Sequence, residues 1–156
     1  MKIFEESTRI MKREIKFRGK DPKGGWVEGY YLQDLTQGKM RSYIFNCPCY
    51  WEVIPETVGQ LTGQLDKNKK EIWEGDIVRV GILSPNYTGA YPEPYYVDTV
   101  CIYKEGAFLY KRISPFDKKK LSRNWTYKPM HKFEIYSTEI IGNIHDNPEL
   151  LEGGAE

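Results

Sequence analysis

The sequence lacks long hydrophobic runs, and it has almost no excess of charge of either sign. Its apolar stretches are only a few residues long, far short of the about 20 that a membrane-spanning helix needs. No apolar stretch of signal-peptide length follows Lys2, so we expect a protein of the cytoplasm with no membrane partner. The 23 basic and 22 acidic residues leave a net charge of +1, and aromatic residues make up 14% of the chain. This composition excludes a disordered protein, which would have few aromatic residues and a high net charge.

Cysteine and histidine are also scarce. The cysteines are Cys47, Cys49 and Cys101, an odd number that argues against a disulfide framework in a reducing compartment. The segment Cys47-Pro48-Cys49 could supply half of a zinc site, which wants about four ligands. The remaining candidates, Cys101, His131 and His145, show no paired spacing. We therefore expect ordinary thiols, no metal and no cofactor.

What the sequence does contain is alternation of polar and apolar residues. Residues 14–18 alternate in this way, as in a strand with one buried face, and residues 26–32 form a second such segment that is rich in aromatic side chains. Asp21-Pro22 and Gly24-Gly25 lie between them and favour a turn, so the two strands are predicted to pair as a hairpin. Further strands are predicted over residues 41–45, 50–54, 57–62, 71–73, 77–82, 96–103, 107–113, 133–136 and 139–144.

Turn residues and breaks separate these strands. Lys104-Glu105-Gly106 is predicted to close a hairpin, and residues 66–70 form a polar tip in which Asn68 best tolerates left-handed geometry. Residues 84–94 hold three prolines and are predicted to be a long loop. A single helical turn is expected over residues 147–151, with Asn147 as its N-cap.

These elements predict a mainly β protein with little helix. An antiparallel N-terminal sheet is expected over residues 13–54, and a small SH3-like or barrel-like β unit over residues 55–151, with Pro55 at the boundary. Residues 1–12 are expected to form an N-terminal arm and residues 152–156 a tail. At 156 residues the chain is long enough for one domain or two small ones.

Three blocks of residues carry a resemblance to a known family. They are Arg13-Glu14-Ile15-Lys16-Phe17-Arg18-Gly19-Lys20 with Trp26-Val27-x-Gly29-x-Tyr31; Thr57-Val58-Gly59-Gln60-x-Thr62-Gly63 with Asp66-Lys67-Asn68 and Lys70-Glu71-Ile72-x-Glu74-Gly75-Asp76-Ile77-Val78; and Ile141-Gly142-Asn143-Ile144-His145-x-Asn147-Pro148. The sequence thus resembles the YopX family, small proteins found mostly in bacteriophages and prophages. The resemblance implies a phage or prophage protein in the cytoplasm of a bacterial host, and it assigns no activity or ligand to any residue. Lys69 departs from the family, whose turn often has glycine there, and the ten residues before Met11 are extra.

The sequence contains no recognisable catalytic constellation. Glu71, Glu74 and Asp76 are the only dense acidic trio, and we interpret them as solvated turn acids rather than as the two facing carboxylates of a glycosidase. Neither His131 nor His145 accompanies a nucleophile motif. We therefore predict no catalytic residue and no enzymatic activity.

Charge is unevenly distributed along the chain. Residues 104–132 carry a local balance of +7, whereas residues 133–156 contain six acids and no Lys or Arg. Such a split indicates either a polyanion-binding face or two segments that neutralise one another. The basic stretch also contains Phe116, Trp125 and Tyr127, so it could bind single-stranded or structured nucleic acid. The candidate binding residues are Lys111, Arg112, Lys118, Lys119, Lys120, Arg123, Trp125 and Lys128.

Aromatic residues crowd the first half of the chain. Each could simply pack in the core, but an aromatic excess on a sheet edge also marks a protein interface, and a neighbouring subunit is one way to cover that edge. The candidate interface residues are Trp26, Tyr30, Tyr31, Tyr50 and Trp51. We predict a non-enzymatic accessory or binding protein that forms a homo-oligomer, with nucleic-acid binding through residues 111–132 as the alternative. The sequence identifies no small-molecule ligand.

Overall fold

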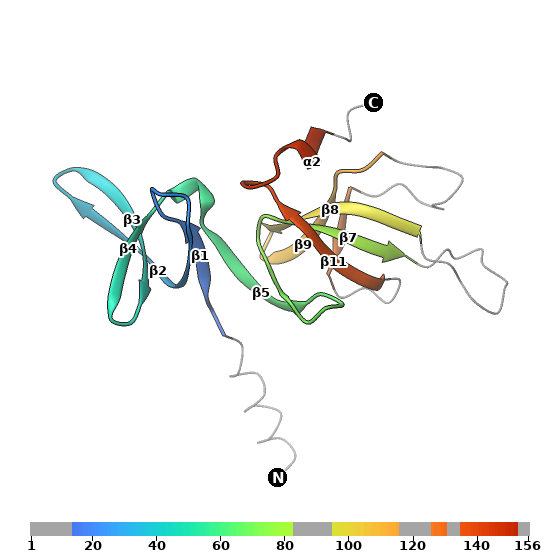
Figure 1. Ribbon diagram of the computed structural model, residues 1–156, viewed down its shortest axis with the longest axis horizontal. Coiled ribbons are helices and arrows are strands. Elements are labelled where there is room, and N and C mark those ends of the chain that lie inside the picture. Colours follow the sequence, from blue (N-terminus) through green and yellow to red (C-terminus); the bar gives the residue numbers. More distant parts are fainter. Residues whose placement is uncertain (1–13, 83–94, 116–125, 131–134, 153–156) are drawn as a thin grey trace, which may run out of the picture. The chain divides into compact units, whose positions relative to one another are not determined.

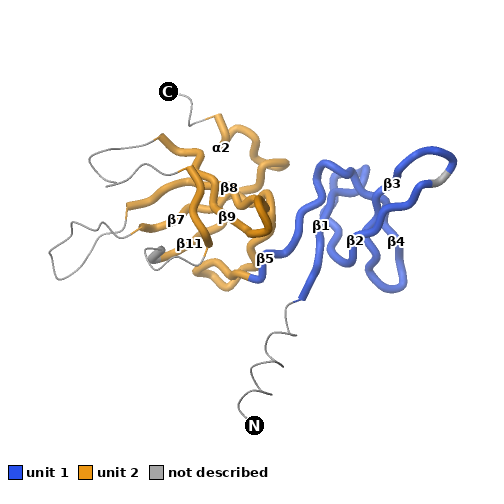
Figure 2. Tube along the Cα trace, turned by 180° about the vertical axis from the view of Figure 1, so that it is seen from behind, with its two compact units in different colours: residues 1–63 blue, residues 64–156 orange. Residues whose placement is uncertain are grey.

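Antiparallel strands make up most of the residues that the computed structural model describes, which are 14–82, 95–115, 126–130 and 135–152 (Figure 1). The described helices are the short 3-10 turn η1 (Pro55–Thr57) and the single helical turn α2 (Glu149–Glu152). The prediction of a mainly β protein with little helix is therefore confirmed. The chain divides into two compact units, residues 1–63 and residues 64–156 (Figure 2).

Unit 1 is an antiparallel meander with short connections. Its strands are β1 (Phe17–Lys20), β2 (Trp26–Thr36), β3 (Lys39–Asn46), β4 (Cys49–Val53) and the first part of β5 (Gly59–Leu65), in the order β4-β3-β2-β1-β5. The predicted turn between β1 and β2 is confirmed. Asp21 Oδ1 accepts the N–H groups of Lys23 and Gly25 at 2.8 and 2.9 Å, and Gly24 has a φ of +89°. An aspartate bonding to backbone two residues on, followed by a left-handed glycine, is the chemistry of a tight turn.

The meander curls back onto β1. Gly29 marks a close approach of two strands, because a Cβ there would lie 2.1 Å from the Phe45 carbonyl oxygen. Beyond the end of β4, the Ile54 N–H donates to the Lys20 carbonyl oxygen at 2.8 Å, which joins this end of the meander to β1. The side chains enclosed by the curl form the inner face of unit 1. The most buried of them are Ser42, Ile44 and Val53.

The chain passes from unit 1 to unit 2 within β5, after Gly63. From the sequence, the boundary was predicted at Pro55 and a strand was predicted from Thr57. Pro55 instead begins η1, since its ring fixes φ for the first position of a helical turn. Thr57 then fastens η1 to unit 1, because its Oγ1 donates to the Ile54 carbonyl at 2.7 Å and accepts the Lys20 N–H at 2.8 Å. After η1, the start of β5 pairs with β1.

Unit 2 contains β6 (Glu71–Trp73), which follows β5 in the order of the first sheet, and a five-stranded antiparallel sheet. The strands of that sheet are β7 (Asp76–Ile82), β8 (Tyr95–Lys104), β9 (Ala107–Arg112), β10 (Tyr127–Pro129) and β11 (Ile135–Asn143), in the order β10-β9-β8-β7-β11. Within the described strands the edges β10 and β11 do not pair with each other, so this sheet is open rather than a closed barrel. The β8–β9 hairpin turns at Glu105 and Gly106, both with positive φ, as predicted.

The core of unit 2 follows the alternation of β7. Val78, Val80 and Ile82 are buried on one face, and Arg79 lies on the other face, exposed to solvent. The buried residues that complete this cluster are Ile72, Val97, Cys101, Tyr110 and Met130. The alternation of residues 77–82 therefore predicted the buried face of this strand correctly.

Two strands of unit 2 differ from the sequence prediction. β10 lies in the basic stretch, where no apolar periodicity marks a strand, and it is held by antiparallel pairing with β9 from Tyr127↔Lys111 to Pro129↔Leu109. β11 is one continuous strand where two were predicted, and register shifts after Ile135 and Ile140 accommodate its irregular pattern. In both places the neighbouring strand decides the conformation.

Candidate functional site

A row of aromatic residues crosses three strands of unit 1. Tyr30 of β2 lies opposite Phe45 of β3, and Phe45 lies opposite Tyr50 of β4. Directly opposed residues of antiparallel strands point to the same face of the sheet, so the three rings share one face. Tyr30 is 63% exposed and Tyr50 is 65% exposed, and the ring centroids of Phe45 and Tyr50 are 4.7 Å apart. The row is therefore turned towards solvent.

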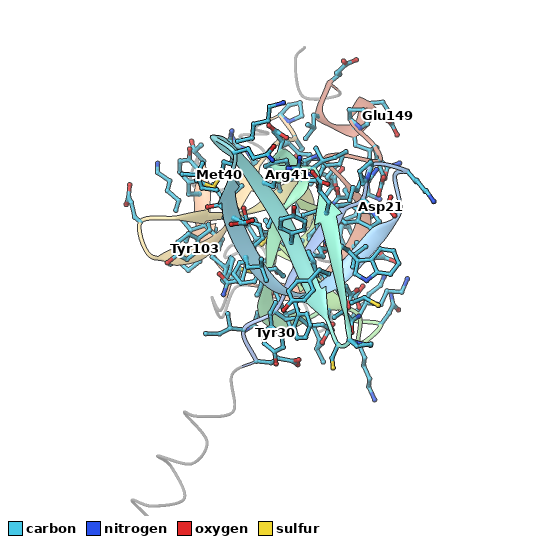
Figure 3. All side chains as sticks on the ribbon, turned by 90° about the vertical axis from the view of Figure 1, so that its left-hand side faces the viewer. Asp21, Tyr30, Met40, Arg41, Tyr103 and Glu149 are labelled. Atoms are coloured by element: carbon cyan, nitrogen blue, oxygen red, sulfur yellow. The ribbon has the colours of Figure 1, made fainter. Side chains whose placement is uncertain are left out.

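The aromatic row continues along the sheet. Leu32 and Tyr43 form the next opposed pair on the same face, two residues further along their strands, and both are partly exposed. The outer aromatic face is the surface formed by Tyr30, Leu32, Tyr43, Phe45 and Tyr50. Figure 3 looks onto unit 1, with Tyr30 at one end of the β2–β3 ladder and Met40 and Arg41 at the other.

The inner face carries the alternate residues of the same strands. Tyr31, Ile44 and Trp51 form an opposed row, and Ile44 at its centre is fully buried. The Tyr31 hydroxyl is 2.9 Å from Ser42 Oγ, and its ring centroid is 5.7 Å from that of Phe17. Tyr31 is thus half-buried on the inner face, whereas Trp51, on the edge strand, remains 45% exposed. The predicted interface residues are therefore divided between two faces.

Trp26, the fifth predicted interface residue, lies among cations. The Arg18 guanidinium carbon is 4.6 Å from the centre of its ring, and Lys20 Nζ is 5.4 Å from it. Lys20 lies opposite Trp26 and Arg18 lies opposite Glu28, so all four residues share the face that carries Tyr30. Lys16 belongs to the same group, since its Nζ is 2.9 Å from Glu28 Oε2. The cation row consists of Lys16, Arg18 and Lys20.

The cation row was not predicted from the sequence, although the sequence contains a signal for it. Lys16 and Arg18 are the polar positions of the alternating segment 14–18, and alternation places them on the face opposite Phe17. The even-numbered residues of β2, including Trp26 and Tyr30, lie on that same face because β1 and β2 pair in register. Alternation in the two paired strands, taken together, predicts basic and aromatic residues on one face of the sheet.

The far end of the outer aromatic face is more acidic. Arg41 lies opposite Asp34, and its Nη1 is 3.9 Å from Glu52 Oε2. A hydrogen bond with Tyr43 and the charges of Glu52 and Asp34 raise the pKa of the Arg41 guanidinium above its ordinary value. Leu35 and Met40 form an opposed, exposed pair at the hairpin end, on the inner side of the sheet. The face is thus cationic at β1 and closer to neutral at the β2–β3 turn.

The basic segment predicted from the sequence is only partly described. Lys118, Lys119, Lys120, Arg123 and Trp125 lie outside the described residues. Of the others, Lys111 is exposed, Arg112 is partly buried, and Lys128 is only 9% exposed. Lys111 lies opposite Tyr127, whose ring is 4.3 Å from Lys104 Nζ. The described part of this segment therefore presents fewer exposed cations than the sequence predicted, because the register with β9 places Lys128 opposite the buried Tyr110.

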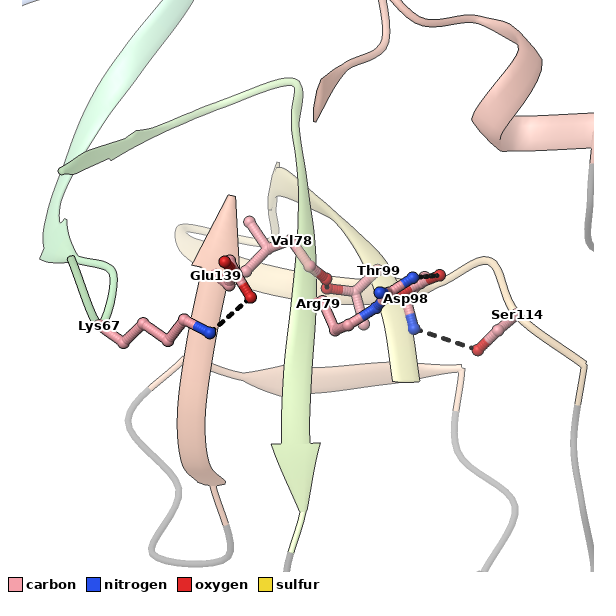
Figure 4. Close-up of polar contacts among 7 residues, drawn as sticks. All are labelled: Lys67, Val78, Arg79, Asp98, Thr99, Ser114 and Glu139. Atoms are coloured by element: carbon pink, nitrogen blue, oxygen red, sulfur yellow. Dashed lines mark hydrogen bonds and ion pairs between the residues drawn. The ribbon is translucent and has the colours of Figure 1, made fainter. Parts of the chain in front are cut away.

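The exposed face of unit 2 is occupied by paired charges (Figure 4). Lys67 Nζ is 2.6 Å from Glu139 Oε2, and Arg79 contacts both carboxylate oxygens of Asp98, at 2.8 and 3.0 Å. The Asp98 N–H in turn donates to Ser114 Oγ at 3.2 Å. The hydrogen bond with Glu139 and its charge raise the pKa of the Lys67 ammonium, against a smaller effect of burial. The two members of each pair neutralise one another.

The acidic residues that could have served catalysis have structural partners. Asp76 is almost fully buried, and its carboxylate accepts the Trp73 N–H at 2.8 Å and the Asn143 side-chain amide at 3.1 Å. Glu74 Oε1 accepts the Tyr103 N–H at 3.3 Å. The prediction of solvated turn acids is therefore wrong for Asp76, because it cross-links β7 to the end of β11.

Neither a metal cluster nor a membrane-crossing helix is present in the parts of the chain that the structure describes. No group of three or more His, Cys, Asp and Glu side chains there could hold a metal ion. No helix among these residues is long and apolar enough to span a bilayer. Cys47 is exposed in the β3–β4 turn and Cys49 is exposed at the start of β4, whereas Cys101 is buried with its sulfur 3.8 Å from that of Met130.

Comparison with known proteins identifies a family. The family model described as YopX protein matches residues 16–152, which is most of the chain. Among solved structures, the crystal structure of protein EF1440 from Enterococcus faecalis is similar, with 21% sequence identity and a TM-score of 0.46. That alignment covers 88% of this chain and 98% of the other. A search of curated proteins gave no match.

Proposed function

The chain belongs to the YopX family, and from the geometry of unit 1 we propose that it is a non-enzymatic binding protein whose contact surface is the outer aromatic face. One observation carries this proposal: Tyr30, Phe45 and Tyr50 form a row of opposed rings on the solvent side of the sheet. Aromatic side chains are enriched at binding interfaces, where a large rigid ring gives much contact area at little cost in entropy. A folded domain gains no stability from leaving them in water.

The surroundings of the row support binding rather than catalysis. Each of its rings is held by strand pairing on the sheet, as a contact surface requires. The acidic residues Glu74 and Asp76 are engaged by backbone and amide donors of unit 2. The proposed role is therefore to hold another macromolecule.

Self-association is the form of this proposal in which the partner is a second copy of the chain. β4 supports it, because it is an edge strand whose residues Tyr50 and Trp51 are exposed on opposite faces. The resemblance to the family adds the proposal that the protein acts in the cytoplasm of a bacterial cell as a phage or prophage product.

Site-specific photo-crosslinking tests the contact surface. A benzophenone amino acid replaces Tyr30 or Tyr50 in the full chain, and in a control it replaces Tyr96, a tyrosine of β8 that is 52% exposed. On irradiation in bacterial cells we expect adducts from positions 30 and 50 and few or none from position 96. Absence of adducts at both positions, or equal yields at position 96, would reject the outer aromatic face as the contact surface.

Sedimentation velocity over a range of protein concentrations tests self-association separately. We expect the mass to rise with concentration and Tyr50→Ser to weaken that rise, while Tyr96→Ser leaves it unchanged. A protein that stays monomeric throughout would reject self-association, and adducts to other molecules at positions 30 and 50 would still support a contact surface.

A further inference from the structure

We propose that the outer aromatic face and the cation row together bind single-stranded nucleic acid, a proposal that rests on the proposed function and names the ligand class of that surface. The inference follows from one juxtaposition in unit 1. Aromatic rings that can stack on bases lie on the same sheet face as three basic side chains that can meet phosphates. This site is distinct from the basic stretch over residues 111–132.

The rings have the arrangement that stacking requires. Tyr30 and Tyr50 are well exposed on either side of Phe45, and the tilted Phe45–Tyr50 pair has its centroids 4.7 Å apart. Every base has a π face, so a row of exposed rings accepts successive bases with little regard to sequence. A β-sheet face that carries two or three such rings is a recurrent platform for single strands.

The cations lie beside the rings in a regular line. Arg18 and Lys20 are alternate residues of β1, and Lys16 lies two residues before Arg18, so consecutive Cα atoms of this row are about 7 Å apart in an extended chain. This spacing is of the same order as that between successive phosphates of an extended strand. Arg18 and Lys20 are held over the Trp26 ring, which places positive charge directly at an aromatic surface.

The charges of the cation row and the outer aromatic face favour a single strand over a duplex, which has a higher charge density. Glu28 pairs with Lys16, and Glu52 approaches Arg41 at the far end, so the positive potential is confined to the β1 end. A duplex hides its bases from the rings and offers only phosphates, which these few cations would hold weakly. A single strand can use both sets of contacts, with phosphates on the cation row and bases on the aromatic row.

Fluorescence anisotropy with a labelled oligothymidylate of about twelve nucleotides tests the inference directly, since this length covers a single-strand site. We expect binding at low salt that weakens as salt rises, with a slope of log K against log salt of about −2 for three phosphate contacts. A duplex of the same length should bind more weakly. Lys20→Gln should lower the affinity and reduce the magnitude of the slope by about 0.7.

Matched variants in the two units locate the site. Tyr50→Ser should lower the affinity about tenfold, because it removes one stacking ring. Its control is Tyr103→Ser, which removes the exposed member of the comparable Tyr103–Phe108 pair of unit 2, with centroids 5.2 Å apart. Lys104→Gln is the control for Lys20→Gln, since Lys104 also lies over an aromatic ring. Both controls should bind as the unchanged protein does, and thermal unfolding should show that all four variants are folded.

Each outcome decides the question. Absence of oligonucleotide binding at the lowest salt overturns the inference. It is also overturned if Lys111→Gln loses binding while Lys20→Gln binds as the unchanged protein does, because the site would then lie in the basic stretch. If no oligonucleotide binds but positions 30 and 50 form protein adducts, including adducts with a second copy, the contact surface stands and its ligand is a protein. If neither binding nor adducts are found, both the inference and the proposed function fail.

Discussion

The carboxylate of Asp66 accepts the backbone N–H of Ile140, 74 positions further along the chain, at 3.3 Å. The same carboxylate accepts the N–H groups of Asn68 and Lys70 through Oδ1, at 2.7 and 2.9 Å, and the side chain is almost fully buried. The adjacent Lys67 N–H donates to the Thr138 carbonyl at 2.8 Å. One acidic residue thus shapes the β5–β6 turn and fastens it to β11.

Replacing Asp66 should destabilise the protein. Asp66→Ala leaves three part-buried N–H groups without this acceptor, and an unsatisfied buried group costs about 1–3 kcal/mol, so the free energy of unfolding should fall by at least about 2 kcal/mol. Asp66→Asn keeps one carbonyl oxygen and should cost less. Urea unfolding of both variants measures the effect, with the exposed Asp34→Ala as control. A loss for Asp66→Ala no larger than for the control would contradict the role of the carboxylate.

The stability that Asp66 contributes should depend on pH. Burial alone would raise the pKa of its carboxyl, but the hydrogen bonds from the N–H groups of Lys70, Ile140 and Asn68 outweigh burial and lower it. Because the pKa is lower in the folded state, the contribution is present above the unfolded pKa and is lost as pH falls through the folded pKa. The difference in unfolding free energy between the unchanged protein and Asp66→Asn should therefore shrink in acid. A difference that is constant from neutral pH down to acid unfolding would refute this.

Lys69→Gly should stabilise the protein. Lys69 has a φ of +63°, although Asn68 is the residue of this turn that best tolerates left-handed geometry. A left-handed conformation costs an ordinary residue about 1–2 kcal/mol in the folded state, and glycine avoids this cost. Part of this gain is lost because glycine raises the conformational entropy of the unfolded chain. We expect a net gain of about 0.5–1 kcal/mol by urea unfolding. Asn68→Gly is the control, and it should be neutral or destabilising because Asn68 does not have positive φ.

Gly29→Ala should be the most damaging glycine substitution in unit 1. Its Cβ would lie 2.1 Å from the Phe45 carbonyl oxygen, so β2 and β3 must separate to admit it. Gly38→Ala is the matched control, because its Cβ would meet open space and only its φ of +74° is unfavourable, at about 1 kcal/mol. Thermal unfolding should show a larger loss for Gly29→Ala. Equal losses would mean that the close approach of the two strands is not required.

Alkaline pH should destabilise the protein through Tyr110. Burial raises the pKa of its hydroxyl well above the ordinary value of about 10. Because the pKa of Tyr110 is higher in the folded state, its stabilisation is complete below the unfolded pKa. The stabilisation is lost as pH rises from the unfolded pKa towards the folded pKa, because tyrosine in the unfolded chain ionises first. Tyr110→Phe removes this ionisation, so its stability should fall less steeply between pH about 9 and 11. Parallel curves for the two proteins would exclude Tyr110 as the cause.

Part of the candidate site could be predicted from the sequence. Trp26, Tyr30 and Tyr50 were identified by their density in one segment, and all three lie on the outer side of unit 1. Tyr31 and Trp51 belong to the same dense segment but lie on the inner face, because successive residues of a strand point to opposite sides. Composition along a segment cannot separate such neighbours, and only the pairing register and the curl onto β1 do so.

The order of residues alone determined where the chain forms strands and where it turns. These are local properties, such as the alternation of side chains, the Asx turn at Asp21 and the glycines with positive φ. They can be predicted without knowledge of the tertiary structure. The tertiary structure decided which side of each strand meets water. Lys128 lies opposite the buried Tyr110 of β9, and Asp76 is buried and accepts a hydrogen bond from Asn143. The cations of β1 lie beside Trp26 only because two strands pair in one register. These outcomes depend on contacts between residues far apart in the sequence. The energies of such contacts cannot be predicted from a local sequence pattern.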